Sequence, residues 1–215
     1  MTGVIFDLDG TLLDTLEDLA DAVNHVLRQF DYPERTIREV RRFVGNGAAL
    51  LIQRAVPEGA DPEPVLAAFH TFYDTHCQVK TKPYEGILDA LAELGKEYPI
   101  AVVSNKPDSA VKALCADYFP GIYARGESTD CPRKPAPDMV KKAMQAIGVE
   151  HCVYVGDSEV DVATAQNAGV PCLTVLWGFR DREELETAGA KHFCANPADL
   201  VRSLKDMLWS DAAST

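Results

Sequence analysis

The first apolar run of the chain leads directly into two acidic residues. Residues 4–6 (Val-Ile-Phe) predict a short buried strand, and Asp7 and Asp9 follow it, ahead of a Gly-Thr turn. Residues i and i+2 of an extended chain share a face, so both carboxylates can point into one site. Such carboxylates repel each other unless one holds a proton or a hard cation such as Mg²⁺ lies between them. From these residues alone, an acidic strand exit followed by a turn is an equally good interpretation.

Three further motifs follow along the sequence. A second apolar run, residues 100–103, ends in Ser104, and a Lys-Pro pair at Lys134 precedes a later helical stretch. A third apolar run ends in a Gly-Asp pair at residues 156–157. Its acid, Asp157, is followed four residues later by Asp161. Taken singly, each motif has an ordinary explanation. An acid at a helix start can be an N-cap, and a lysine before a proline can be a surface residue.

Taken together and in this order, the four motifs resemble those of the haloacid dehalogenase-like hydrolase superfamily, in its Mg²⁺-dependent phosphatase branch. They span the chain from Asp7 to Asp161. The resemblance implies a Rossmann-like core in which the strand before Asp7 is central. It also implies a helical cap that is inserted after this first strand and closes over the site.

The periodicity of the chain predicts an α/β fold of the same layout. From about residue 83 onward, short apolar runs alternate with helical patterns, which indicates a parallel sheet covered on both faces. Between residues 15 and 82 the pattern is helical throughout. We therefore predict a Rossmann-like parallel-sheet core domain formed by residues 1–14 and 83–215, with an inserted all-helical cap domain formed by residues 15–82. Capping boxes are predicted at Thr15 with Asp18 and at Thr36 with Glu39.

The resemblance also implies roles for the acidic residues. Asp7 is the expected nucleophile, which would form an aspartyl-phosphate. Asp9 is the expected general acid and base, and it would also contribute a metal ligand through its backbone carbonyl. Asp157 is the expected direct Mg²⁺ ligand, and Asp161 binds the metal either directly or through water. We expect Glu159 to be solvated.

Ser104 and Lys134 are the expected phosphate-holding residues. A phosphoryl group in transfer carries negative charge on its oxygens, so a hydroxyl donor and a compact cation suit it. The backbone N–H of Asn105 would help Ser104, and Thr11 would lie close to the phosphoryl group. Lys106 is expected at the surface. Asp14 is expected to cap the first helix of the cap.

The cap carries a Gly-Asn-Gly loop at Gly45, Asn46 and Gly47. Spacing alone favours an ordinary turn between two helices. However, the loop and the motifs around Ser104 and Lys134 resemble those of bacterial phosphoglycolate phosphatases. That resemblance implies 2-phosphoglycolate as the substrate, with the loop, and less directly Arg54, binding its carboxylate. The alternatives left open are an inorganic pyrophosphatase, a sugar-phosphate phosphatase or phosphomutase, and a non-catalytic binding protein on the same fold.

Composition limits the partners and the compartment. The chain has 21 Lys and Arg against 33 Asp and Glu, a net charge of −12, which argues against binding nucleic acid. No apolar stretch approaches the roughly 20 residues that a membrane helix needs, and no signal-peptide pattern is present. The six cysteines are scattered without a Cys-x-x-Cys pair. We expect a cytoplasmic monomer or homodimer that acts on a small phosphorylated metabolite and binds neither nucleic acid nor membranes.

Overall fold

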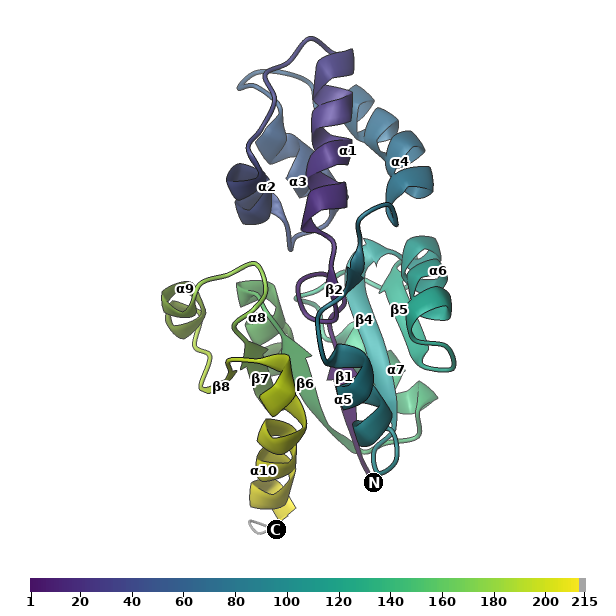
Figure 1. Ribbon diagram of the computed structural model, residues 1–215, viewed down its shortest axis with the longest axis vertical. Helices are drawn as coiled ribbons and strands as arrows, with labels where there is room; N and C mark the ends of the chain where they lie inside the picture. The colour runs from purple at the N-terminus through teal and green to yellow at the C-terminus, as the bar shows by residue number, and fades with distance from the viewer. Residues whose placement is uncertain (213–215) are drawn as a thin grey trace.

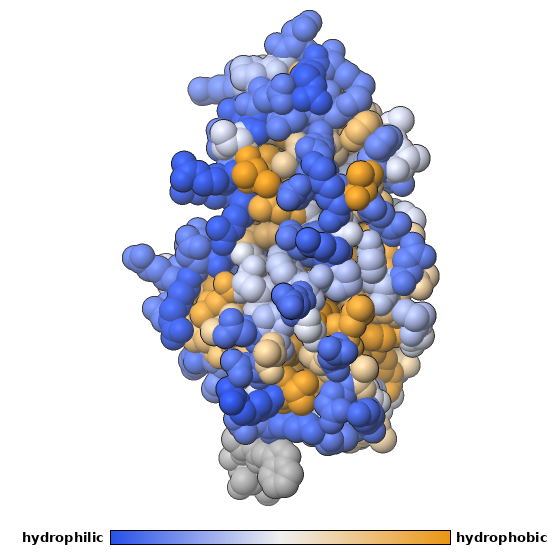
Figure 2. All heavy atoms as spheres, in the orientation of Figure 1, coloured by the Kyte–Doolittle hydropathy of each residue, from blue (hydrophilic) through white to orange (hydrophobic). Residues whose placement is uncertain are grey.

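The computed structural model describes residues 1–212, in which a sheet flanked by helices lies below a group of four helices (Figure 1). The chain starts in the sheet, passes through the four helices, and returns to the sheet for its remaining length. The α/β architecture expected from the sequence is confirmed. Figure 2 shows that, on the face in view, hydrophilic residues cover most of the outer end of the four helices, while hydrophobic residues gather lower on the molecule.

The sheet has six strands in the order β5-β4-β1-β6-β7-β8, and every neighbouring pair is parallel. The strands are β1 (Thr2–Phe6), β4 (Ile100–Pro107), β5 (Tyr123–Glu127), β6 (His151–Gly156), β7 (Cys172–Val175) and β8 (His192–Cys194). β1 is central, and Val4 lies beside Ile100 on one side and Val153 on the other. The chain builds the β4 side of the sheet first and the β6 side afterwards, so the direction of winding reverses at β1. In open α/β sheets, ligands bind at the carboxyl ends of the strands, at the point where the winding reverses.

Helices cover both faces of the sheet. They are α5 (Ile87–Leu94), α6 (Asp108–Tyr118), α7 (Asp138–Ala146), α8 (Glu159–Ala168), α9 (Arg182–Thr187) and α10 (Leu200–Ala212), with a 3₁₀ turn at Pro197–Asp199. Alternate residues of β1 serve the two faces: Val4 and Phe6 belong to one hydrophobic cluster, and Ile5 belongs to the other. Because both faces are buried, the strand must be apolar throughout.

The inserted segment consists of α1 (Leu16–Gln29), α2 (Ile37–Phe43), α3 (Ala48–Ala55) and α4 (Glu63–His76). We keep the name cap for residues 15–82. The cap has a hydrophobic cluster of its own, in which Val23, Ile52 and Phe69 are buried. Where the chain leaves and re-enters the sheet region, two short strands pair antiparallel: β2 (Leu13–Asp14) and β3 (Lys82–Pro83). The division into two domains stays a prediction.

The two predicted capping boxes have different outcomes. Thr36 and Glu39 form theirs, with the Thr36 hydroxyl accepting from the Glu39 N–H and the Glu39 carboxylate accepting from the Thr36 N–H at 2.8 Å. The box at Thr15 was wrong, because Thr15 makes no side-chain cap bond. Asp18 instead accepts the N–H groups of Lys80 (2.9 Å) and Thr81 (2.8 Å), which ties the start of α1 to the returning chain.

Helix α1 is capped by another residue. Asp14 accepts the N–H of Leu16 at 3.4 Å, as expected.

In the part of the chain that the structure describes, no helix has the length and apolar character needed to cross a bilayer. All six cysteines are free thiols.

Candidate active site

Asp7 lies at the carboxyl end of the central strand β1. Its N–H donates to the carbonyl of Val155 at 2.8 Å, which extends the β1–β6 pairing by one residue. Its carboxylate lies 2.7 Å from Nζ of Lys134. Burial raises the pKa of Asp7 well above its usual value, and the nearby carboxylate of Asp161 raises it further, while Lys134 opposes both effects.

Asp7, Asp157 and Asp161 form a buried cluster of three acids. Each offers a carboxylate oxygen, and these three atoms all lie within 4.8 Å of one another. Burial, followed by repulsion from Asp161, raises the pKa of Asp157 to about 7. Hard oxygen donors at this spacing suit a divalent cation, which would relieve their mutual repulsion. The residues therefore fit the metal expected for the family.

Asp157 is held in place by its surroundings. The Thr11 hydroxyl donates to one of its oxygens at 3.0 Å, and the Phe179 N–H donates to the other at 2.7 Å. The chain passes so closely on two sides that a Cβ at Gly10 or Gly178 would lie 2.4 or 2.3 Å from the Asp157 side chain. Glycine is therefore required at both positions. Thr11 was predicted to contact the substrate, but its hydroxyl is directed at Asp157 instead.

Both oxygens of Asp161 are engaged by protein groups. One accepts from the N–H and hydroxyl of Ser158, as part of a capping box at the start of α8. The other accepts from Nζ of Lys134 (2.8 Å) and the hydroxyl of Tyr154 (3.0 Å). Burial tends to raise its pKa, but Lys134 outweighs that effect and the pKa is lowered. These bonds favour the open alternative in which Asp161 acts on a metal through water.

The side chain of Asp9 is turned away from the three-acid cluster. It accepts from the Ser104 hydroxyl at 3.3 Å and pairs with Nζ of Lys106 at 2.9 Å. The prediction of Lys106 as a surface residue was wrong. Its side chain is only 5% exposed and also donates to the hydroxyl of Tyr73 in α4 at 2.8 Å. Burial lowers the pKa of Lys106, but the negative charge of Asp9 outweighs this and the pKa is raised.

A sequence signal for Lys106 did exist. It lies two residues after Ser104 in β4, so the two side chains share a face. Asn105 faces the other way and links three segments. Its amide donates to the carbonyls of Gly45 (3.1 Å) and Lys134 (3.0 Å), and it accepts the Lys134 N–H at 2.7 Å. Asn105 thus holds the cap loop and Lys134 with its side chain, in addition to any role of its backbone.

A cavity of about 70 Å³ lies between these groups and the cap. Core residues on its wall are Asp7, Asp9, Ser104, Asn105, Lys106, Lys134 and Asp157. Cap residues on its wall include Gly45, Gly47, Leu51, Phe69 and Tyr73. The structure thus brings most of the predicted site together from segments far apart in the sequence.

Two predicted substrate-binding residues lie outside the cavity wall. Asn46 and Arg54, predicted to bind substrate, are not among the residues that line this cavity. Arg54 donates to the Phe43 carbonyl at 2.9 Å and borders a separate cleft, so its side chain serves the cap itself. The Glu159 side chain is 42% exposed, in keeping with the expectation of a solvated residue, and it also pairs with Arg180 at 2.7 Å. Sequence reasoning missed Tyr73, which lines the cavity, Tyr154, which donates to Asp161, and Arg180, which joins the sheet region to the cap outside the cavity, because an apolar or surface pattern explained each position equally well.

Comparison with known proteins decides the family. The profile of the haloacid dehalogenase-like hydrolase family matches residues 4–175. The chain belongs to this family. A phosphoglycolate phosphatase of Mesorhizobium japonicum is 33% identical, with 94% of this chain and 95% of the relative covered. One of Rhodobacter capsulatus is 37% identical, covering 82% and 85%.

Among solved structures, a protein of Lactobacillus delbrueckii subsp. bulgaricus superposes with a TM-score of 0.89. It is 35% identical over 94% of this chain and 97% of that one, and it is proposed to be a phosphoglycolate phosphatase. The similarity therefore extends over nearly the whole hydrolase, including the cap.

Proposed function

We propose that this hydrolase is a Mg²⁺-dependent phosphatase that converts 2-phosphoglycolate and water to glycolate and phosphate. The observation that carries the chemistry is the Asp7 carboxylate, which lies at the end of β1, 2.7 Å from Lys134, on the wall of a small cavity. The substrate is inferred from the phosphoglycolate phosphatases that resemble the chain over most of its length.

In the first step, an oxygen of Asp7 attacks phosphorus and the bond to the glycolate oxygen breaks. Lys134 lowers the pKa of Asp7 against the effect of burial, which favours its ionised form, and Ser104 can hold a phosphoryl oxygen. Asp9 protonates the leaving oxygen and then removes a proton from the water that hydrolyses the aspartyl-phosphate. Asp7, the Asp9 carbonyl and Asp157 would hold a bound Mg²⁺, which would supply positive charge that offsets the carboxylates and the phosphoryl oxygens.

The carboxylate of the substrate needs a second positive region in the cavity. Lys106 is a second buried cation on the cavity wall, besides Lys134. Across the cavity, α3 begins at Ala48 after Gly47, and this glycine has no side chain with which to cap the first N–H groups. Free N–H groups at a helix start attract anions. We assign the carboxylate to Lys106 and the Gly45–Gly47 loop, with the loop acting through its backbone.

The size of the cavity bears on the sugar-phosphate alternative but does not distinguish 2-phosphoglycolate from pyrophosphate. At about 70 Å³ it suits an ester with a very small leaving group better than a sugar phosphate. Inorganic pyrophosphate is also small and anionic, and Lys106 would suit its second phosphate as well as a carboxylate. A non-catalytic binding protein would not need Asp7, Asp9, Ser104 and Lys134 arranged around one cavity.

The test is phosphate release from 2-phosphoglycolate, pyrophosphate, a hexose phosphate and p-nitrophenyl phosphate, with Mg²⁺ and with EDTA. We expect Mg²⁺-dependent turnover that is fastest on 2-phosphoglycolate, and none from the Asp7→Asn variant. Fast turnover of pyrophosphate with little on 2-phosphoglycolate would overturn the substrate but leave the phosphatase chemistry standing. Undiminished turnover in excess EDTA would overturn the metal site.

A further inference from the structure

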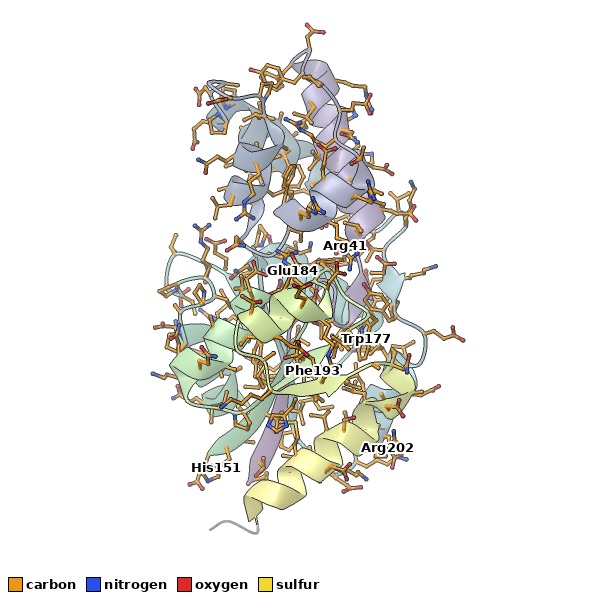
Figure 3. All side chains as sticks on the ribbon, turned by 90° about the vertical axis from the view of Figure 1, so that its left-hand side faces the viewer. Arg41, His151, Trp177, Glu184, Phe193 and Arg202 are labelled. Atoms are coloured by element: carbon orange, nitrogen blue, oxygen red, sulfur yellow. The ribbon has the colours of Figure 1, made fainter. Side chains whose placement is uncertain are left out.

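Three consecutive residues after β7, Gly178, Phe179 and Arg180, contact the cap, and the first two also lie against Asp157. They belong to the sheet region by sequence, because they follow the strand Cys172–Val175. Cap residue Arg41 lies at the boundary that they cross (Figure 3). The proposed reaction steps involve none of these three residues.

The guanidinium of Arg180 is buried and joins the sheet region to the cap. On one side it pairs with both oxygens of Glu159, at 2.7 and 3.2 Å. On the other side it donates to the carbonyls of Arg41 (3.1 Å) and Val44 (2.7 Å). These carbonyls lie at the C-terminal end of α2, where carbonyls lack helical partners and a positive charge is favoured.

Phe179 makes the second connection. Its side chain is 6% exposed and belongs to the hydrophobic cluster of the cap, although its backbone follows β7. Its N–H donates to Asp157 at 2.7 Å. The Phe179 ring is therefore held by the cap, while its backbone N–H is held by Asp157, the expected metal ligand.

Gly178 completes the segment. Its carbonyl accepts from the guanidinium of Arg41 at 3.0 Å, so the cap also donates back to the sheet region. Its Cα lies so close to Asp157 that a Cβ would be 2.3 Å from that side chain. The segment supports Asp157, and the cap holds the segment. Movement of the cap would therefore free the segment to shift away from Asp157.

We propose that Arg180 is a positioning residue that latches the cap closed over the cavity, and that the Phe179 peptide couples this closure to the orientation of Asp157. The proposal rests on the proposed phosphatase function. Other contacts join the same two parts: Asn105 to Gly45 and Lys106 to Tyr73 lie at the cavity wall, and Tyr118 to Thr81 lies where the chain leaves the cap. Arg180 does not line the cavity, so it can be changed without removing a group that touches substrate.

Closure matters differently for small and large substrates. A small ester is enclosed by the closed cap, which excludes water and brings the cap loop to it. An aryl phosphate has a larger leaving group, so the cap encloses it less completely and closure contributes less to its turnover. Loss of a latch therefore slows the small ester more, whereas loss of general stability slows both equally.

The experiment compares Arg180→Ala and Arg180→Lys with Arg182→Ala. Arg182 is a matched control, because it is two residues away and pairs only with exposed Glu186 on α9 among the polar contacts described. Thermal unfolding first checks that each variant folds. kcat/KM is then measured for 2-phosphoglycolate and p-nitrophenyl phosphate, and amide hydrogen exchange is followed in the metal-free proteins.

For Arg180→Ala, we expect kcat/KM for 2-phosphoglycolate to fall about 10- to 100-fold, the range for losing a buried charged hydrogen bond. Activity on p-nitrophenyl phosphate should fall less, because that ester shares the dependence on Asp157 but gains less from closure of the cap. Arg180→Lys should be intermediate, since it keeps the charge without the planar fork. Residues 37–44 and 177–181 should exchange faster in Arg180→Ala but not in Arg182→Ala.

An equal fall on both esters, or unchanged exchange at residues 37–44, would overturn the latch. Failure of the proposed function looks different. If the native protein prefers another small ester, that ester replaces 2-phosphoglycolate in the comparison. If it hydrolyses no phosphate ester, hydrogen exchange alone decides: faster exchange in a folded Arg180→Ala or Arg180→Lys variant supports the latch, and unchanged exchange refutes it.

Discussion

Replacing Lys134 by Met tests whether the acid cluster depends on a single cation. Nζ of Lys134 lies 2.7 Å from Asp7, 2.8 Å from Asp161 and 3.0 Å from the hydroxyl of Tyr154. The Lys134 side chain is only 2% exposed. Methionine fills similar space without the charge, so the substitution leaves two buried carboxylates facing each other without their shared partner.

The structure sets the expected size of the effect. Removing one partner of a buried ion pair destabilises a protein by about 3–5 kcal/mol, because the remaining charge is buried without compensation. For a domain of this length, each kcal/mol lowers Tm by about 2–4 °C, which predicts a fall of about 6–20 °C. The pKa of Lys134 is raised, so its stabilisation is fully present at neutral pH.

Thermal unfolding of the native and variant proteins, with and without Mg²⁺, measures this loss. In the variant, the deficit should shrink as pH falls, because Asp7 and Asp161 can then take up protons. Mg²⁺ should restore part of the Tm by supplying another cation. Lys112→Met is the matched control: Lys112 is 62% exposed and pairs with Asp108, so its loss should change stability by less than about 1 kcal/mol.

A Tm within the range of the Lys112 control would refute the reasoning. It would mean that the acids are already neutral in the folded protein, or that water reaches them freely. A large fall that does not change with pH would also contradict it, since the cost would then come from packing rather than from charge.

Three further predictions concern the same site. Asp7→Asn should remove phosphate release and abolish covalent phosphate incorporation in quenched reactions, while Tm without metal is maintained or rises, because a repelling charge is lost. The metal-free protein should gain Tm as pH falls from about 8 to about 5, because Asp157, with a pKa raised to about 7, binds a proton in the folded state that the unfolded chain does not bind; a flat profile would argue against the burial of this acid. Gly178→Ala should weaken Mg²⁺ binding measured by calorimetry, since its Cβ would overlap Asp157, and unchanged affinity would show that the segment yields without moving the acid.

Several features of this protein were determined by the sequence alone. The apolar residues 4–6 before Asp7 predicted a buried parallel strand, because a parallel strand covered on both faces must be apolar along its length, and the family resemblance added its central place. The periodicity of the inserted segment likewise predicted its helices. The capping box of Thr36 was predictable because it depends only on Glu39, three positions away. Short elements such as β8 (His192–Cys194) could not be predicted from periodicity, because three residues are too few to show a pattern.

Contacts between distant segments were decided only by the tertiary structure. Asp18 looked like a capping residue but binds the N–H of Thr81, 63 residues away. Lys106 looked like a surface residue but is buried between Asp9 and Tyr73, and Arg180 reaches the carbonyl of Val44 across 136 residues. A local pattern states that a polar group needs a partner, whereas the packing of whole elements decides which partner lies within reach.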